Sequence, residues 1–376
     1  MKFIYIGRVS CFMTDAASIR VHNVAAALKG QGHQVDFICQ EGTVPNGKIL
    51  NDGSMCYGVF DEKTGKLSMW FEWLLGNKAV RQLKTLLKAE HYDGVILYNA
   101  PVTLGKKVLK LCRKHGMAVF HDVTEWYEIK WSKGPLMCAY AWLVDRRIRL
   151  LDPKCDGIIA ISPYLEAFYK EKVPTINLPP VFEGEGHCNT SKNKIPRFLY
   201  AGSPSKKDEL FNFIEAIKEI NSEGIRAEIT IIGAPIPEDS EKLALEGIHY
   251  FPRMPHEAVL NALGEHDFSV LLRREARYAK AGYSTKVAEA LCNGTPVFCN
   301  EIGGADMDIH NGFNGIKIGA ADIRTIKDAI IQIIQMQPEA IVEMKNNAFR
   351  FGQKKYLRKN YEENLSSFMM DLGMKA

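Results

Sequence analysis

The stretch A-G-Y-S-T-K-V-A-E-A-L-C-N-G-T-P-V-F-C, residues 281–299, decides the fold and the chemistry expected of this chain. It predicts a turn, a short helix and then an apolar strand. Ser284 and Thr285 can cap the helix start, where free N–H groups and the helix dipole favour an anion. Lys286 falls in the first turn and Glu289 one turn further on. A cation and a carboxylate at one helix mouth suit a ligand with phosphates at one end and a hydroxylated sugar at the other, although a single Lys or Glu on a helix is more often merely solvated.

An alternation of strand-like and helical segments runs through the whole chain and predicts an α/β fold with parallel sheets. The expected strands cover residues 3–6, 35–39, 94–98, 118–121 and 157–161, then 197–201, 227–232, 249–251, 268–272 and 296–299. The expected helices cover residues 19–29, 79–88, 104–115, 136–150, 208–222, 255–263, 285–292 and 323–336. Because 376 residues are too many for one ordinary core, we expect two doubly wound, Rossmann-like domains.

The expected domain limits follow from local composition. Residues 173–196 are rich in proline and glycine and show no periodicity, so they form the expected linker. We therefore expect a first domain over residues 1–178, a second over residues 179–352 and a C-terminal helical segment over residues 353–376. Ligands of open parallel sheets bind beyond the carboxyl ends of the strands, so the motifs that follow strands are the candidates for a site.

The overall composition excludes several classes of protein. A hydrophobic content of 46% with 24% charged residues describes a soluble globular protein, and a net charge of +4 does not indicate nucleic-acid binding. The nine cysteines are scattered without a C-x-x-C pair, so neither a zinc site nor a disulfide framework is expected, and the thiols fit a reducing cytoplasm. The longest uncharged apolar run, residues 135–144, is shorter than the roughly 20 residues that span a bilayer. We expect a cytoplasmic protein made without a signal peptide.

Residues 281–299 resemble the donor-binding signature of glycosyltransferase family 4, the retaining enzymes of GT-B fold. They are closest to a polysaccharide-assembly branch that reads A-G-F-P-T-K-x-x-E-x-L-x-x-G-T-P-V. The resemblance implies two Rossmann-like domains facing a cleft, a nucleotide-sugar donor, and no metal or other cofactor. The second Glu of the family's E-x7-E pattern falls on Glu289, which would hold the ribose hydroxyls, whereas the first is replaced by Ala281. In this branch Lys286 would be the polar contributor that remains.

The resemblance also implies a phosphate-binding turn after the first strand of the second half. Gly202 begins a stretch that is similar to the family's G-R-x-x-x-K-G loop, with Ser203 in the Arg position and Lys207 in the Lys position. Lys206 takes that role if the alignment shifts by one residue. Arg273, which follows a later strand, would replace the missing Arg charge. The alternative is that adjacent lysines belong to an ordinary solvated turn.

Further donor contacts are implied at three other turns: Ala17 and Ser18 near the phosphates or sugar, Arg253 and Met254 near the nucleobase, and Gly303 and Gly304 near the donor sugar. Arg253 is equally compatible with a role in stabilising its loop. The sequence Asp306-Met307-Asp308 matches a metal-binding D-x-D pattern, but here it predicts a helix N-terminus without a metal.

The first half contributes H-D-V-T-E-W-Y, residues 121–127, after an expected strand. A histidine at a strand end can exchange a hydrogen bond with a reacting sugar. The resemblance gives His121 this role as a catalytic residue beside Lys207 and Lys286, and places Glu125, Trp126 and Tyr127 in an acceptor pocket, since aromatic faces pack against sugar rings. The alternative for His121 is a ring satisfied by its neighbours.

Together these features predict a retaining glycosyltransferase that moves a sugar from a nucleotide-diphosphate sugar, with UDP favoured, to a glycan or lipid-linked glycan. The branch implies capsule, O-antigen or exopolysaccharide synthesis. Basic residues in segments 78–88 and 106–114, and Arg146, Arg147 and Arg149 with Trp131 and Trp142 nearby, suggest peripheral contact with the cytoplasmic face of the inner membrane. Two alternatives stay open: a nucleotide-sugar 2-epimerase of GT-B fold, and a non-catalytic partner subunit, since Ala281, Ser203 and Met307 replace polar contacts.

Overall fold

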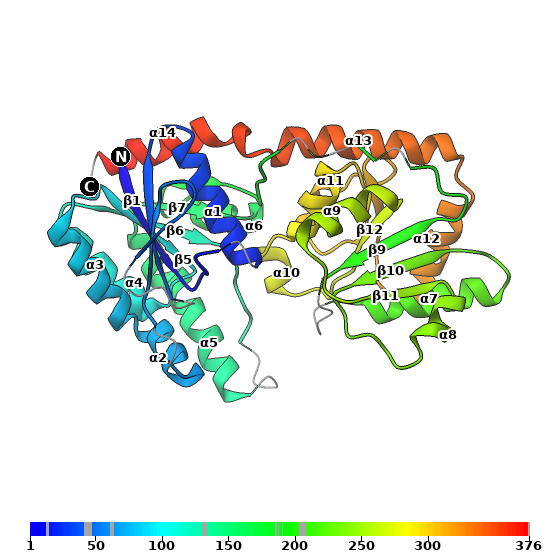
Figure 1. The fold of residues 1–376 in the computed structure, drawn as a ribbon, viewed down its shortest axis with the longest axis horizontal. Coiled ribbons are helices and arrows are strands. Elements are labelled where there is room, and N and C mark those ends of the chain that lie inside the picture. The colour runs from blue at the N-terminus through cyan, green and yellow to red at the C-terminus, as the bar shows by residue number, and fades with distance from the viewer. Residues whose placement is uncertain are drawn as a thin grey trace. The chain divides into compact units, whose positions relative to one another are not determined.

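The structure is a computed structural model that describes residues 1–12, 15–40, 47–60, 64–129, 134–184, 186, 188, 189, 191–202 and 208–374. The chain forms two compact units, each built around its own sheet (Figure 1). The first unit comprises Met1–Glu183, Ala281–Tyr283 and Arg358–Ala376. The second comprises Gly184–Lys280 and Ser284–Leu357. Among the described residues, no helix is both long enough and apolar enough to cross a bilayer.

The first unit contains an eight-stranded sheet in the order β3-β4-β2-β1-β5-β6-β7-β8. Its strands are β1 (Lys2–Gly7), β2 (Gln34–Cys39), β3 (Lys48–Ile49), β4 (Met55–Gly58), β5 (Gly94–Tyr98), β6 (Ala118–Val123), β7 (Gly157–Ala160) and β8 (Thr175–Asn177). All neighbours are parallel except β3 and β4. Every residue of β5 and β6 is buried, as expected for parallel strands covered by helices on both faces.

In the described part of the chain, seven α-helices belong to this unit: α1 (Ala16–Lys29), α2 (Lys66–Leu75), α3 (Asn77–Ala89), α4 (Val102–Lys114), α5 (Pro135–Arg146), α6 (Pro163–Tyr169) and α14 (Glu362–Gly373). Helix α5 continues into a π-helical turn, Arg147–Leu151, and a 3₁₀ turn, Asp152–Lys154. The start of α1 is fixed by a capping box, in which Ser18 and Asp15 each accept a hydrogen bond from the other's backbone N–H. Helices α2 and α6 and the short strands β3, β4 and β8 were not expected from the sequence pattern.

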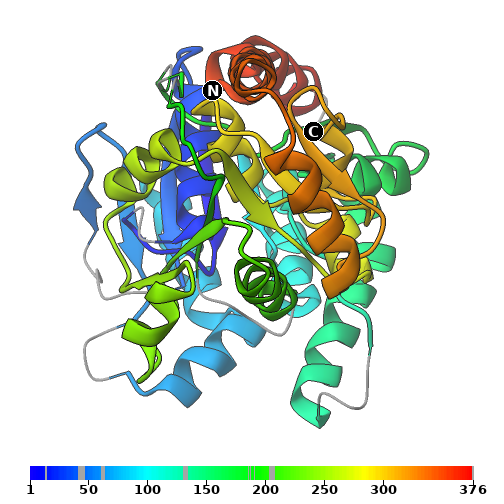
Figure 2. The ribbon, with the colours of Figure 1, turned by 90° about the vertical axis from the view of Figure 1, so that its right-hand side faces the viewer.

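The second unit contains a six-stranded, all-parallel sheet in the order β11-β10-β9-β12-β13-β14. Its strands are β9 (Arg197–Ala201), β10 (Glu228–Ile232), β11 (Ile248–Phe251), β12 (Phe268–Leu271), β13 (Val297–Asn300) and β14 (Gly315–Ile318). Its helices are α7 (Leu210–Ser222), α8 (Ser240–Leu245), α9 (His256–Glu265), α10 (Arg277–Ala281, at the boundary), α11 (Thr285–Cys292), α12 (Ile323–Ile334) and α13 (Pro338–Tyr356). Helices α7 and α12 pack side by side over this sheet (Figure 2).

Both sheets reverse their strand order once, and these points fix where ligands can bind. In the first sheet β1 lies between β2 and β5, and in the second β9 lies between β10 and β12. The crevice outside the carboxyl ends of the strands at such a switch point is the usual ligand site of an open α/β sheet. The ends of β1 and β5 approach closely here, because a Cβ at Gly7 would lie 2.7 Å from the Cβ of Tyr98. The expectation of a doubly wound α/β fold is therefore confirmed, with one switch point in each unit.

The cysteines differ from the expectation. Cys11, in the segment after β1, forms a disulfide with Cys56 of β4, 45 residues later, so the prediction of unpaired thiols is wrong at these two positions. Strand pairing explains the contact, because β2 is parallel to both β1 and β4 and brings their carboxyl ends together. Spacing along the chain gives no signal for a pair that only the sheet assembles.

Candidate functional site

The start of α11 carries a lysine that lies across the end of β9. The Lys286 ammonium is 3.9 Å from the centroid of the Tyr200 ring. A Cβ at Gly202 would come within 2.9 Å of the Lys286 Nζ, and Gly202 has a φ of +137°, a region that side chains disfavour. The glycine therefore gives the lysine room at the switch point of the second sheet.

A second cation and a carboxylate lie beside this lysine. The Tyr200 hydroxyl donates to Asp208 at 2.9 Å, and the Arg273 Nε lies 3.6 Å from an oxygen of the same carboxylate. Arg273 is held after β12 by its backbone N–H, which donates to the Asn300 side chain at 2.8 Å. Burial lowers the pKa of Lys286 to about 8, the Asp208 charge opposes this shift and the Arg273 charge adds to it. Two cations side by side favour a ligand with two negative charges.

Glu289 lies one helical turn beyond Lys286, with 15% of its side chain exposed. Burial raises its pKa to about 7, against the opposing charge of Lys286. Its Oε1 is 4.0 Å from the His256 Nε2 at the start of α9. A partly buried carboxyl group on the same helix as the lysine is suited to hydrogen bonds with ligand hydroxyl groups. We call Gly202, Asp208, Arg273, Lys286 and Glu289 the charged site.

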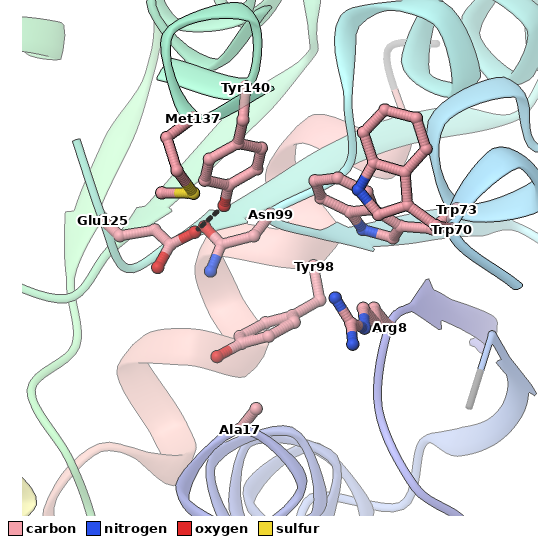
Figure 3. Close-up of a pocket in the computed structure, with 9 residues that line it drawn as sticks. All are labelled: Arg8, Ala17, Trp70, Trp73, Tyr98, Asn99, Glu125, Met137 and Tyr140. Atoms are coloured by element: carbon pink, nitrogen blue, oxygen red, sulfur yellow. Dashed lines mark hydrogen bonds between the residues drawn. The ribbon is translucent and has the colours of Figure 1, made fainter. Parts of the chain in front are cut away.

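The first unit holds a pocket of about 400 Å³ at the switch point of its own sheet (Figure 3). It is lined by Arg8, Ala17, Trp70, Trp73, Tyr98, Asn99, Glu125, Met137 and Tyr140, and we call it the aromatic pocket. Figure 3 shows Arg8, Trp70 and Trp73 on one side and Glu125, Met137 and Tyr140 on the other. Aromatic walls with a few fixed polar groups are typical of sites that bind sugar rings.

The polar groups of the aromatic pocket are held in place by hydrogen bonds. Both oxygens of the Glu125 carboxylate accept, one from the Tyr140 hydroxyl at 2.5 Å and the other from the Tyr127 hydroxyl at 2.6 Å. Asn99 follows β5 with a φ of +42°, and its amide group exchanges two hydrogen bonds with Thr124. Positive φ at a non-glycine residue costs energy and is often found at binding sites.

The family of the chain is shown by two matching family models. Glycosyltransferase Family 4 matches residues 17–177, and Glycosyl transferases group 1 matches residues 188–351. The chain belongs to glycosyltransferase family 4. The first match covers most of the residues of the aromatic pocket and the second covers all five residues of the charged site.

Individual relatives are distant in sequence. A curated protein of Methanocaldococcus jannaschii, the uncharacterized glycosyltransferase MJ1069, is 24% identical over 61% of this chain, and the match spans 58% of that protein's length. Sucrose-phosphate synthase from Thermosynechococcus elongatus has a similar structure, with a TM-score of 0.76, 15% identity and full coverage of both chains. Anabaena Alr3699/HepE in complex with UDP and glucose has a TM-score of 0.67, 11% identity and full coverage of both chains. The structural matches show a shared fold, which is the GT-B fold expected of the family.

The donor-side residues expected for this glycosyltransferase lie in several different settings. Ser284 is buried at the helix start without a side-chain capping bond, and Thr285 is partly buried beside Lys286. Arg253 is exposed and Met254 partly exposed in the loop after β11. Ser203, Lys206 and Lys207 lie outside the described residues.

The turn after β13, expected near the donor sugar, uses its backbone amides within the protein. The N–H groups of Gly303 and Gly304 donate to the Asp306 carboxylate at 3.2 and 2.7 Å. Asp308 in turn accepts from the Tyr356 hydroxyl at 2.7 Å. The two aspartates therefore hold the protein's own turn and helix α13, and a Cβ at Gly304 would lie 2.3 Å from the Ala279 carbonyl oxygen.

Trp126, expected on the acceptor side, and Ser18, expected on the donor side, are both held by the protein's own groups. Trp126 is 4% exposed, its Nε1 donates to Asp145 at 3.0 Å, and its ring packs on Phe168, so it does not line the aromatic pocket. Ser18 is fully buried in the capping box of α1, whereas its neighbour Ala17 does line the pocket. Tyr127 acts through Glu125, whose carboxylate it holds.

His121 is fully buried within β6, and both of its ring nitrogens face other groups of the protein. Its Nε2 accepts the backbone N–H of Ala100 at 3.1 Å, so the ring proton resides on Nδ1, which lies 2.7 Å from Asp152. The other Asp152 oxygen accepts from the Tyr169 hydroxyl and lies 3.4 Å from the Arg147 Nε. The structure therefore gives His121 no exposed atom for a sugar and connects it instead to the turn that carries Asn99.

Seven residues of the aromatic pocket were missed by sequence reasoning: Arg8, Trp70, Trp73, Tyr98, Asn99, Met137 and Tyr140. A signal exists for both Arg8 and Asn99. Asn99 directly follows an expected strand, Arg8 comes two residues after another, and the carboxyl ends of both strands belong to the switch point. The tryptophans come from α2, whose sequence K-L-S-M-W-F-E-W-L-L has apolar residues on most of its circumference and so shows weak periodicity.

Proposed function

We propose that this glycosyltransferase transfers a sugar from a nucleotide-diphosphate sugar, held at the charged site, to an acceptor bound in the aromatic pocket, with retention of configuration. The observation that carries the proposal is the position of Lys286 against Gly202 and Tyr200, with Glu289 one turn along the same helix. This arrangement matches a diphosphate at the switch point and a ribose beside it. Each half of the site belongs to one unit of the chain.

In this proposal the charged site contributes to catalysis by electrostatic stabilisation of the leaving group. As the bond between the sugar and the diphosphate breaks, negative charge develops on the leaving oxygen, and preorganised cations stabilise it. Lys286 and Arg273 supply these cations, with Lys207 from outside the described residues as a third candidate. The leaving diphosphate itself then accepts the proton of the incoming acceptor hydroxyl on the same face, which gives retention without a separate protein base.

Uridine is the base that we propose for the donor, with no metal required. Anabaena Alr3699/HepE, a protein of similar fold, has a structure with UDP and glucose, which supports this choice. Arg253 and Met254 in the loop after β11 are the proposed neighbours of the base, and Glu289 is the proposed partner of the ribose hydroxyls.

A thermal-shift screen against UDP, GDP, ADP and dTDP, each with and without magnesium, tests the donor site. We expect UDP at about 100 times its dissociation constant to raise Tm by roughly 5–10 °C, independently of magnesium, because a ligand of the native state stabilises it by mass action. Glu289→Ala removes the ribose contact and should abolish most of the shift, whereas the exposed Glu241→Ala on α8 should leave it unchanged. If none of the four nucleotides raises Tm, or if UDP raises Tm equally in the Glu289→Ala and Glu241→Ala variants, the proposal is contradicted.

The acceptor that we propose is a glycan, lipid-linked in capsule, O-antigen or exopolysaccharide assembly. The pocket volume of about 400 Å³ is at the small end of the range for ligand pockets and suits one or two sugar rings. The surface around the pocket supports a lipid-linked molecule. Helices α2 and α5, which meet through the Trp73 and Tyr140 rings, expose apolar side chains at Leu67, Phe71, Leu75, Met137 and Trp142. The Arg146 guanidinium lies 4.8 Å from the Trp142 ring centroid.

A basic groove between α3 and α4 adds the charge that an anionic leaflet attracts. It is lined by Arg81, Lys84, Lys107, Lys110 and Lys114 along with Asn77, Val80 and Leu111, and has a volume of about 600 Å³. Exposed aromatic residues together with a cluster of cations are typical of proteins that rest on a membrane surface. We therefore propose peripheral contact of α2–α5 with anionic lipid.

Vesicle co-sedimentation tests this contact. The double variant Phe71→Ser with Trp142→Ser should lower partitioning onto anionic vesicles by roughly tenfold, since it removes apolar area that enters the interface. Phe211→Ser, which removes an even more exposed aromatic side chain from α7 of the second unit, should have no effect. Equal binding to vesicles with and without anionic lipid, or equal loss in the Phe211 control, would contradict this surface.

A further inference from the structure

Three cysteine sulfurs meet at the carboxyl end of the first sheet, outside both halves of the proposed site. Cys11 and Cys56 form a disulfide, and the Cys39 sulfur, at the end of β2, lies 3.4 Å from that of Cys56. All three sulfurs lie within 4.8 Å of one another. They are 5%, 0% and 0% exposed for Cys11, Cys39 and Cys56, so the bond is protected but Cys11 is its most accessible end.

The disulfide fixes the segment that carries Arg8 of the aromatic pocket. This segment leaves β1 at Gly7, where the carbonyl accepts the N–H of Gln40 at 2.8 Å, and reaches the disulfide four residues later. Between these two anchors the residues have no regular secondary structure. Val9 is buried in the hydrophobic core of the first unit. The disulfide is thus the covalent end of a short loop that presents Arg8.

The cluster fits a disulfide better than a bound metal ion. A thiolate is required for metal binding, but burial raises the pKa of the Cys39 thiol to about 12, so this sulfur stays protonated near neutral pH. For the same reason Cys39 does not attack the neighbouring disulfide rapidly, and the Cys11–Cys56 pairing persists. Cys39 is nevertheless close enough to Cys56 to pair with it if Cys11 is removed.

We propose that Cys11–Cys56 is a reversible redox site that orders the Arg8 loop and thereby sets the competence of the aromatic pocket. One thiolate of a dithiol reductant attacks the Cys11 sulfur and displaces the Cys56 thiolate, which takes a proton. The second thiol of the reductant then resolves the mixed disulfide, so that two electrons reduce the protein and the reductant leaves as its own disulfide. Reoxidation takes a small disulfide such as oxidised glutathione. The link to acceptor binding rests on the proposed function of the pocket.

The first test is the state of the thiols. Protein purified without reductant, equilibrated with oxidised glutathione and alkylated in denaturant should carry seven adducts, one for each free cysteine, against nine after treatment with dithiothreitol. Peptide mapping should link residue 11 to residue 56. The Cys39→Ser and Cys112→Ser variants should keep the bond. Nine adducts under oxidising conditions, or a different pairing, would overturn the proposal.

The second test asks whether the bond orders the loop. Amide hydrogen exchange at residues 8–12 should become about tenfold faster when dithiothreitol reduces the wild-type protein, because one of two anchors is lost. Cys56→Ser is the variant that reproduces this effect without reductant, since it removes the partner shared by Cys11 and Cys39. Exchange at residues 197–202 and the thermal shift with UDP should not respond to dithiothreitol.

These readouts do not require glycosyl transfer, so they separate the redox site from the proposed function. If UDP fails to bind while thiol counting and exchange behave as described, the donor proposal fails and the redox site stands. If the bond forms but exchange at residues 8–12 is identical in the two states, control of the loop is excluded. If the serine variants do not fold, amide exchange of the wild-type protein with and without dithiothreitol still tests whether the disulfide orders residues 8–12.

Discussion

Replacing Lys286 by alanine is expected to lower kcat by about 10²–10³-fold, the cost usually measured when one preorganised group is removed from a developing negative charge. The ammonium group lies on the Gly202 turn and the Tyr200 ring, so it is fixed before the donor arrives and needs no reorganisation as charge develops. The alanine variant removes a charge without opening the core, because Lys286 is only partly buried. Its melting temperature should stay close to that of the wild type, and the matched surface variant Lys242→Ala should retain full turnover.

The pH dependence of the wild-type enzyme provides a sharper test of the same residue. The pKa of Lys286 is lowered to about 8, so the ammonium form is present below this pH and is lost above it. We expect kcat/KM, which reports the free enzyme, to fall above pH 8 with a slope approaching tenfold per unit. In the bound state the diphosphate favours the ammonium, so kcat should fall only at higher pH. The Lys286→Arg variant, whose guanidinium stays charged, should lose the fall near pH 8 even if its rate is lower.

An unchanged pH profile in Lys286→Arg would assign the fall above pH 8 to a group other than Lys286, and Glu289 does not account for such a fall. Its pKa is raised to about 7, and its ionised form is the one present at higher pH, so its titration would increase rather than decrease ribose binding through pH 7. The two residues therefore predict limbs of opposite sign. A kcat for Lys286→Ala within threefold of the wild type would remove the lysine from the mechanism altogether.

All residues of the charged site except Asp208 could be predicted from the sequence, because they share one helix or follow strands. Lys286 and Glu289 share one helix, and Ser284 before it predicts where this helix begins. Gly202 and Arg273 each come after an apolar strand. Local rules decide such positions, and the parallel sheet brings the strand ends together. The alternation of strands and helices likewise predicted two doubly wound units.

The aromatic pocket could not be predicted in the same way, because its composition depends on which helices pack over the switch point. Trp73 on α2 and Tyr140 on α5 are 67 positions apart in the sequence but their rings are in contact, and the sequence of neither helix predicts this contact. Trp126 shows the opposite error: an aromatic next to Glu125 points into the core, where Asp145 and Phe168 satisfy it. The Cys11–Cys56 disulfide was missed for the same physical reason, since tertiary pairing of strands creates it.

Replacing Asp152 by asparagine is expected to destabilise the first unit by about 3–5 kcal/mol, the usual cost of removing one partner of a buried ion pair. Asp152 and Arg147 are both fully buried, so the substitution leaves a guanidinium in the core without its counter-charge. For a unit of this size the loss corresponds to a fall in Tm of roughly 10 °C. Tyr169→Phe removes one hydrogen bond to the same carboxylate and should cost only about 1–2 kcal/mol.

The sign of the effect with pH follows from the environment of the carboxyl group. Burial alone would raise the pKa of Asp152, but electrostatic interactions with His121 and Arg147 and the hydrogen bonds from His121 and Tyr169 hold it below its ordinary value. A lowered pKa in the folded state means that the stabilisation is complete above the unfolded value near 4 and is lost as the pH falls through the folded value. The difference in Tm between wild type and Asp152→Asn should therefore be constant at neutral pH and shrink in acid.

A double-mutant cycle decides whether the ion pair is the cause. Combining Asp152→Asn with Arg147→Met removes both charges, and the double variant should recover part of the stability that Asp152→Asn loses. An Asp152→Asn protein as stable as the wild type, or no recovery in the double variant, would contradict this account.

The same network has a consequence for the aromatic pocket that stability alone does not report. The His121 ring lies between Asp152 and the backbone N–H of Ala100, the residue after Asn99. The Asp152 carboxylate therefore fixes the His121 ring, and this ring fixes the turn at Asn99 and Ala100. In Asp152→Asn the His121 ring loses its charged partner, and amide exchange at Asn99 and Ala100 should quicken well below the melting temperature. In Tyr169→Phe, where the contact between His121 and Asp152 is kept, exchange at this turn should stay slow. His121 would then act on the acceptor by positioning Asn99, through a ring that never touches the sugar.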